Sequence, residues 1–90
     1  MPRVQFTNHL RRFFPKLEDG EFEGETVAAI VGALEKRHPG LSAYLVDERG
    51  ALRQHVNIYV EDSLVLDRAR LSDKVGPSTR LFIMQALSGG

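Results

Sequence analysis

The residues with the clearest chemical potential stand at the end of the sequence. The chain finishes in LFIMQALSGG, where Gly89 and Gly90 follow residues typical of a β-strand. At a glycine frequency of about 7%, two glycines at the last two positions arise by chance in roughly 0.5% of chains. Glycine lacks Cβ and allows close approach of the backbone to another molecule. We therefore expect the terminal carboxylate of Gly90 to be the reactive group.

Other groups that could do chemistry are scattered. His9, His38 and His55 lack the spacing of a metal site, so we expect surface or capping roles and no bound metal. The acidic residues of VDERG and VED lie in predicted turns, without neighbours that would form a pocket. Neither set predicts a catalytic residue.

The segment LRRFFPK joins three cations to two phenylalanines, a combination that can bind nucleic acid through charge and stacking. The whole chain, however, balances twelve basic residues against twelve acidic ones. A neutral chain has no general attraction to nucleic acid or to an anionic membrane. We expect a loop that buries one phenylalanine and exposes its arginines, with neither nucleic acid nor membrane as a partner.

Composition limits the class of protein. Ninety residues with 42% hydrophobic and 27% charged content predict one small globular domain spanning residues 1–90. The absence of cysteine excludes disulfides, thiol nucleophiles and thiolate metal sites. The N-terminus lacks the apolar core of a signal peptide, and no apolar run is long enough to cross a bilayer. These features favour a cytoplasmic protein.

The first half of the chain predicts two strands and a helix. Alternation in RVQFT predicts a strand over residues 3–7, and a long loop leads to a short strand around Phe22. Val27, Ile30, Val31 and Leu34 recur on one helical face, so we expect a helix over 27–37 with Thr26 as its N-cap.

The second half predicts three strands. After an irregular stretch over 41–52, VNIYV alternates as a strand, with a turn at 61–63 and a return strand at 64–66. A brief helical turn using Leu71 and Val75 follows, then a turn at 76–78. In the last strand, RLFIMQA, Leu81 and Ile83 share one face and the alternate residues share the other.

This order of elements predicts an α+β fold of the β-grasp, or ubiquitin-like, type. One main helix has a single apolar stripe, which a mixed sheet of four to five strands can cover. The last strand would then end in a flexible tail over residues 86–90.

The chain resembles the MoaD/ThiS family of ubiquitin-like sulfur carriers over nearly its whole length. The likeness rests on the opening strand with LRRFF, the helix TVAAIVGALEKRHPGL, the strand HVNIYVED, the turn LSDKV and the ending ALSGG. VNIYVED is most similar to the branch that serves synthesis of cysteine or a thio-metabolite. Two features depart from the family pattern: Gln85 replaces a frequent proline, and residues 76–79 replace an Asp/Gly-rich turn.

The resemblance implies a protein co-substrate rather than an enzyme. An E1-like adenylating enzyme of the MoeB/ThiF type would use ATP to adenylate Gly90, and a sulfur donor would convert the adenylate to a thiocarboxylate. A sulfur-accepting biosynthetic enzyme would take the sulfur. The carrier itself would bind no cofactor.

A carrier of this kind needs two recognition surfaces, because ordering the tail on binding opposes association and requires contacts elsewhere. Within the tail, the activating enzyme would recognise Leu87, Ser88 and Gly89. On the sheet face away from the helix, we expect Phe82, Met84 and Tyr59 to form an apolar patch that docks a partner; a dimer contact or scattered surface apolar residues are the alternatives.

Three alternatives remain open from the sequence. The chain could be the small subunit of molybdopterin synthase, which would co-purify with a large subunit. It could be a protein modifier that is joined to lysines through Gly90 and leaves a Gly-Gly remnant on them. It could also be a non-covalent interaction module whose function survives removal of Gly90.

Overall fold

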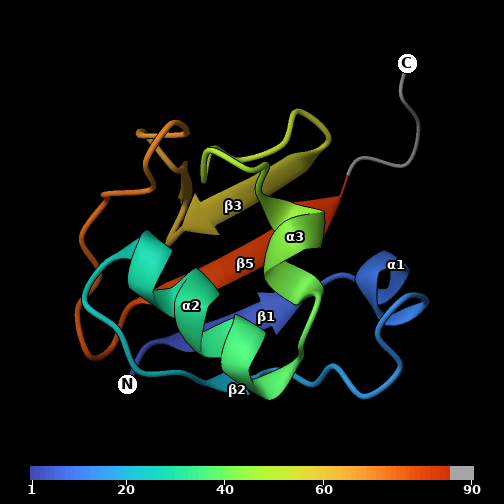
Figure 1. Ribbon diagram of the computed structural model, residues 1–90. Coiled ribbons are helices and arrows are strands. Elements are labelled where there is room, and N and C mark those ends of the chain that lie inside the picture. Colours follow the sequence, from blue (N-terminus) through green and yellow to red (C-terminus); the bar gives the residue numbers. More distant parts are fainter. Residues whose placement is uncertain (86–90) are drawn as a thin grey trace.

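A computed structural model describes residues 1–85 of the chain as a five-stranded sheet with three helices (Figure 1). The elements in chain order are β1 (Arg3–Phe6), α1 (Asn8–Arg11), β2 (Gly20–Glu21), α2 (Val27–Arg37), α3 (Leu41–Leu45), β3 (Val56–Val60), β4 (Ser63–Leu64) and β5 (Arg80–Gln85).

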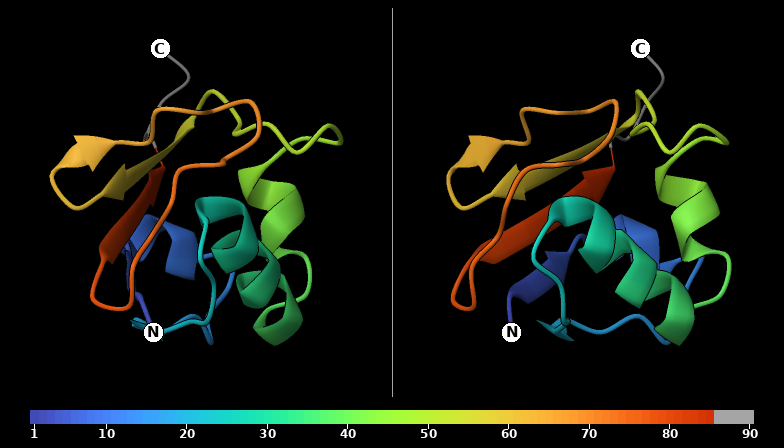
Figure 2. Two further views of the ribbon diagram at one scale, coloured as in Figure 1. Left: turned by 90° about the vertical axis from the view of Figure 1, so that its left-hand side faces the viewer. Right: turned by 60° about the vertical axis from the view of Figure 1, so that its left-hand side comes forward.

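The sheet is mixed, with the strand order β2-β1-β5-β3-β4. The central strand β5 runs parallel to β1 and antiparallel to β3. Parallel neighbours need a long crossover connection, which here contains α2, α3 and the β3–β4 hairpin. Figure 2 shows α2 and α3 on the same side of the sheet. The predicted β-grasp fold is confirmed.

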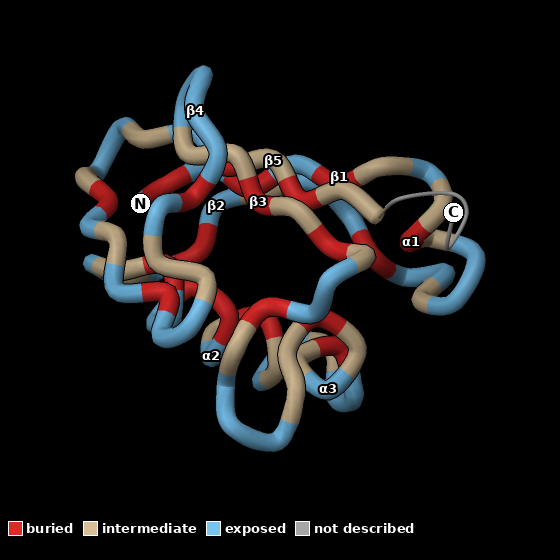
Figure 3. Tube along the Cα trace, turned by 90° about the horizontal axis from the view of Figure 1, so that it is seen from above, coloured by how far each residue is buried: buried red, intermediate tan, exposed pale blue. Residues whose placement is uncertain are grey.

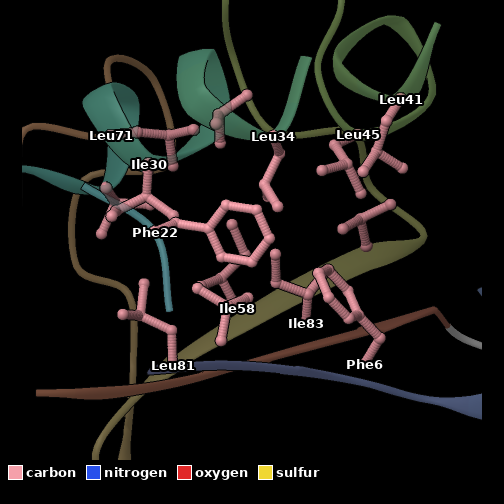
Figure 4. Close-up of a cluster of buried hydrophobic side chains, with 14 of the residues drawn as sticks. Phe6, Phe22, Ile30, Leu34, Leu41, Leu45, Ile58, Leu71, Leu81 and Ile83 are labelled. Carbon is pink, nitrogen blue, oxygen red and sulfur yellow. The ribbon is translucent and has the colours of Figure 1, made fainter. Parts of the chain in front are cut away.

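The hydrophobic core fills the space between these helices and the sheet (Figure 4). Ile30 and Leu34 point from α2 toward Ile58 and Ile83, and all four side chains are fully buried. Along β1 and β5, buried residues alternate with more exposed ones, whereas the two-residue strands β2 and β4 contain no buried residue (Figure 3). Burial of each such side chain contributes about 1.5–3 kcal/mol, so the core fixes which face of β5 points inward.

Helix α2 has the bounds that its sequence predicts. The hydroxyl oxygen of Thr26 accepts a hydrogen bond from the backbone N–H of Ala29 at 3.1 Å, which satisfies a donor in the first turn. At the other end His38 is the C-cap, and Gly40 takes a left-handed conformation with φ of 98°. Pro39 prevents the helix from continuing.

Two short helices were not predicted. Helix α1 lies in the expected loop, and α3 lies in the stretch expected to be irregular. Helices of four and five residues are too short to show a clear apolar period, and they are not stable in isolation. Burial of Leu10 in α1 and of Leu41 and Leu45 in α3 stabilises them here.

Two other local predictions were wrong. The return strand is Ser63–Leu64 instead of 64–66, because only these residues pair with β3. The helical turn expected around Leu71 is replaced by a turn that ends there, in which the Leu71 N–H bonds to the Asp67 carbonyl oxygen. Leu71 and Val75 are nevertheless buried, and the turn at 76–78 is present.

Candidate functional site

Strand β5 ends five residues before Gly90, the predicted reactive residue. The predicted attachment residue Gly90, and the predicted recognition residues Gly89, Ser88 and Leu87, lie outside the described residues. The structure describes the strand that precedes them in the sequence. This strand, β5, is central in the sheet, is hydrogen-bonded on both sides and ends at Gln85.

Only one neighbouring strand accompanies β5 to its last residue. Val56 of β3 pairs with Gln85, whereas β1 pairs with β5 only as far as Phe6 and Ile83. Beyond Phe6 the chain turns into α1, and the Thr7 N–H makes a last hydrogen bond to the Ile83 carbonyl oxygen. Gln85, the last described residue, therefore lies between α1 and the start of β3 (Figure 1).

The start of β3 is held by one guanidinium group. Arg68 donates to Asn57 Oδ1 at 3.1 Å and to the carbonyl oxygens of Arg53 at 2.8 Å and Val56 at 3.1 Å. Three bonds from one planar donor group restrict both the strand and the loop before it. The strand that borders Gln85 is thus fixed in position.

The three predicted docking residues lie together on the open face of the sheet. Tyr59 and Phe82 are direct cross-strand partners, and Met84 is two positions beyond Phe82 on β5. All three are half-buried, on the side opposite α2. Leu64, which pairs with Tyr59 and is exposed, extends this apolar surface, although the sequence did not single it out.

Tyr44 and Gln85 form a contact that the sequence did not predict. The Tyr44 hydroxyl donates a 2.6 Å hydrogen bond to Gln85 Oε1. The Tyr44 ring also lies 5.3 Å from the Phe13 ring and 6.0 Å from the His55 ring, centroid to centroid. Tyr44 stands three positions after Leu41, so LSAYL predicts a ring at the edge of the apolar face of a helical turn, but no spacing in the sequence relates this ring to Gln85.

A second polar network holds the loop between α1 and β2. Arg11 pairs with Asp19 at 2.8 Å and donates to the Leu17 carbonyl oxygen at 3.2 Å. Asp19 Oδ1 also accepts the Phe6 N–H at 3.0 Å. The prediction that this loop exposes its arginines is therefore wrong for Arg11, which is half-buried by these bonds.

The carboxylates with lowered pKa values serve turns and helix ends. The N–H groups of Gly40 and then Ser42 lower the pKa of Glu35. The N–H groups of Ala51 and then Arg49 lower the pKa of Asp47. The Ser72 hydroxyl, followed by the Arg70 N–H, lowers the pKa of Asp67. Hydrogen bonds to the ionised form produce these shifts. None of the three groups belongs to the open face of the sheet.

The histidines are separate in space as well as in sequence. His38 caps α2, His9 lies in α1, and His55 lies against Tyr44. No group of three or more histidine or acidic side chains that could hold a metal ion occurs in residues 1–85. Within the same residues, no helix has the length and apolar character needed to span a membrane.

Comparison with known proteins agrees with the fold and identifies a family. The model of the ThiS family matches residues 4–90. Sulfur carrier protein CysO of Mycobacterium tuberculosis is 33% identical over 69 residues, which cover 74% of each chain.

Solved structures show the same relationship. A chain in the crystal structure of the Amycolatopsis orientalis BexX/CysO complex is 32% identical, with a TM-score of 0.85 and full coverage of both chains. The crystal structure of Mycobacterium tuberculosis CysO is 27% identical, with a TM-score of 0.83 over 97% of this chain and 100% of that one. The chain therefore belongs to the ThiS family of sulfur carrier proteins.

Proposed function

We propose that this protein carries sulfur as a thiocarboxylate at Gly90. The observation that carries the proposal is the family match, which extends to Gly90 itself. The chain has no cysteine, so no thiol competes with the terminal carboxyl group as a site for covalent sulfur. The central strand β5 ends at Gln85, so only five residues separate Gly90 from the core of the domain.

The carboxyl group must be activated before it accepts sulfur. A C-terminal carboxyl group has a reference pKa of about 3.5, so at neutral pH it is an anion and a poor electrophile. A sulfur carrier is not itself catalytic, and we assign the activation to an E1-like adenylating enzyme. A carboxylate oxygen attacks the α-phosphorus of ATP and pyrophosphate leaves, which gives an acyl-adenylate.

The second step installs sulfur. A hydrosulfide donor attacks the acyl carbon, the carbon–oxygen bond to the phosphate breaks, and AMP leaves with a proton released to solvent. The product is a thiocarboxylate, with no net oxidation or reduction. This product then donates sulfur to a cytoplasmic biosynthetic enzyme. The likeness to CysO proteins favours synthesis of cysteine, with another thio-metabolite as the alternative.

Recognition by the enzyme needs more than the tail. Ordering a backbone residue costs about 1–2 kcal/mol, so fixing five residues costs roughly 5–10 kcal/mol. Contacts with Leu87, Ser88 and Gly89 oppose part of this cost. We assign a further part of the recognition to the open face of the sheet, where Phe82, Met84 and Tyr59 form an apolar surface.

The test is an intact-mass measurement. Incubation with the cognate adenylating enzyme, ATP and sulfide should replace one oxygen of the protein by sulfur. A variant without Gly90 serves as the matched control and should keep its mass. An unchanged mass of the full chain, with an enzyme shown to form pyrophosphate on another substrate, would contradict the proposal.

A further inference from the structure

A partly exposed aromatic cluster borders the end of β5. It consists of His9, Phe13, Tyr44 and His55, and we call it the tail-root cluster. His9 and Phe13 have ring centroids 6.0 Å apart, and Tyr44 lies between Phe13 and His55. Through its hydroxyl, Tyr44 also holds the side chain of Gln85. The cluster thus joins α1, α3 and the start of β3 around the last described residue.

Phe13 is the exposed member of this cluster. Its side chain is 57% exposed, whereas the adjacent Phe14 is half-buried and packs against the core. The core therefore does not require the ring of Phe13. A large aromatic side chain held against a second ring loses little conformational freedom on binding, and such residues often anchor protein interfaces.

The charges beside Phe13 suggest the chemistry of a partner. Arg12 and Lys16 are exposed, and no carboxylate of residues 1–85 lies within ion-pair distance of either. Arg11, in contrast, is neutralised by Asp19. An apolar ring flanked by uncompensated cations is complementary to an apolar recess bordered by carboxylates.

The length of the segment after Gln85 limits how far from the domain an enzyme bound to Gly90 can lie. Five residues follow Gln85, and a fully extended chain of five residues reaches at most about 18 Å. This step rests on the proposed function, in which an enzyme acts on Gly90. An enzyme that holds Gly90 must bring its surface to this end of the sheet. The tail-root cluster and its two cations lie there.

We infer that the tail-root cluster docks on the adenylating enzyme, with Phe13 in an apolar recess and Arg12 and Lys16 facing carboxylates. This partner is chosen because it must hold the tail while ATP reacts, whichever pathway later uses the sulfur. Tyr44 acts as a positioning residue, since it contacts both Phe13 and Gln85.

The test is a steady-state assay with the cognate adenylating enzyme and varied carrier concentration. We expect Phe13→Ser to raise KM about tenfold or more, with kcat little changed, because a hot-spot contact is lost. Phe13→Trp should restore most of the affinity. Reversing charge in Arg12→Glu plus Lys16→Glu should also raise KM and weaken its dependence on salt.

Matched controls lie in the segment that leads into β5. Leu66 is an 89% exposed apolar residue, and Lys74 is an exposed cation whose backbone forms an isolated β-bridge with Thr26. Leu66→Ser and Lys74→Glu should leave KM unchanged. Circular dichroism of every variant verifies that the fold is retained.

The outcomes separate this inference from the proposed function. If an active enzyme never converts the wild-type chain to its thiocarboxylate, the proposed function is wrong, and the docking inference then has no partner. If the wild-type chain is loaded and Phe13→Ser keeps its KM, only the docking inference is overturned. Two further results would also overturn the docking inference. One is a wild-type dimer that the substitution Phe13→Ser dissociates. The other is a Phe13→Ser variant that loses binding to a single-stranded oligonucleotide while its KM is unchanged.

Discussion

The Tyr44 hydroxyl donates a 2.6 Å hydrogen bond to Gln85 Oε1 across 41 positions of sequence. This bond ties α3 to the last described residue of the central strand. It also gives a role to Gln85, at a position where the family resemblance leads us to expect proline. The side chain of proline has no acceptor that could take its place.

Removal of this hydrogen bond should lower stability modestly. We expect Tyr44→Phe to reduce the free energy of unfolding by about 0.5–1.5 kcal/mol, because the ring contacts persist and only the hydroxyl is lost. Urea denaturation would measure the change. Tyr59→Phe is the matched control, since no hydrogen bond joins the Tyr59 hydroxyl to another described residue. Equal effects of the two substitutions would show that the bond contributes nothing.

The open face of the sheet should bind the activating enzyme. Phe82 is half-buried and pairs with Tyr59, so its removal from the apolar surface should weaken binding about tenfold or more. Titration calorimetry with Phe82→Ser would measure the affinity, and Leu66→Ser would control for the loss of an exposed apolar side chain. Unchanged affinity in a folded Phe82→Ser variant would exclude this face as the docking surface.

The hydroxyl of Thr7 should lower the stability of the fold. Thr7 Oγ1 is buried, and it has no hydrogen-bond partner among the described residues. A buried hydroxyl without a partner costs about 1–3 kcal/mol, and valine has nearly the same shape. Thr7→Val should therefore raise the free energy of unfolding by about 1 kcal/mol. Destabilisation in a urea titration would reveal a partner for this hydroxyl.

Stability should fall in acid because of Glu35, Asp47 and Asp67. Hydrogen bonds in the folded state lower the pKa of each below its ordinary value, 4.5 for Glu35 and 3.8 for the aspartates. At a pH above these ordinary pKa values, the three carboxylates make their full contribution to the free energy of unfolding. They are then ionised in both the folded and the unfolded chain. As the pH falls below these ordinary values, the unfolded state binds protons first, and the contribution is lost through the folded pKa values.

Chemical denaturation between neutral and acidic pH would measure this loss. Asp47→Asn keeps a side-chain acceptor for the N–H groups of Arg49 and Ala51 but does not titrate. Its stability should therefore decrease less steeply below pH 3.8 than that of the wild-type chain. Identical slopes would show that Asp47 does not contribute to the acid sensitivity.

Local pattern was sufficient for the elements that carry their own signal. Helix α2 has four apolar residues on one face, Thr26 before it and Pro39 after it, so both ends could be predicted. Alternation in β5 predicted that Leu81 and Ile83 are buried while Phe82 and Met84 face the other side. The resemblance of the whole chain added the family and the candidate role of Gly90.

Tertiary structure alone decided the features that join distant segments. Helices α1 and α3 are too short to persist without the core, which stabilises them by burying Leu10, Leu41 and Leu45. Packing of the core also brings Phe13, Tyr44 and Gln85 together, although periodicity describes only neighbours along the chain. The sequence by itself thus determined the family, the main helix and the inward face of the central strand. The surroundings of the tail depend on contacts between remote residues, which only the folded chain creates.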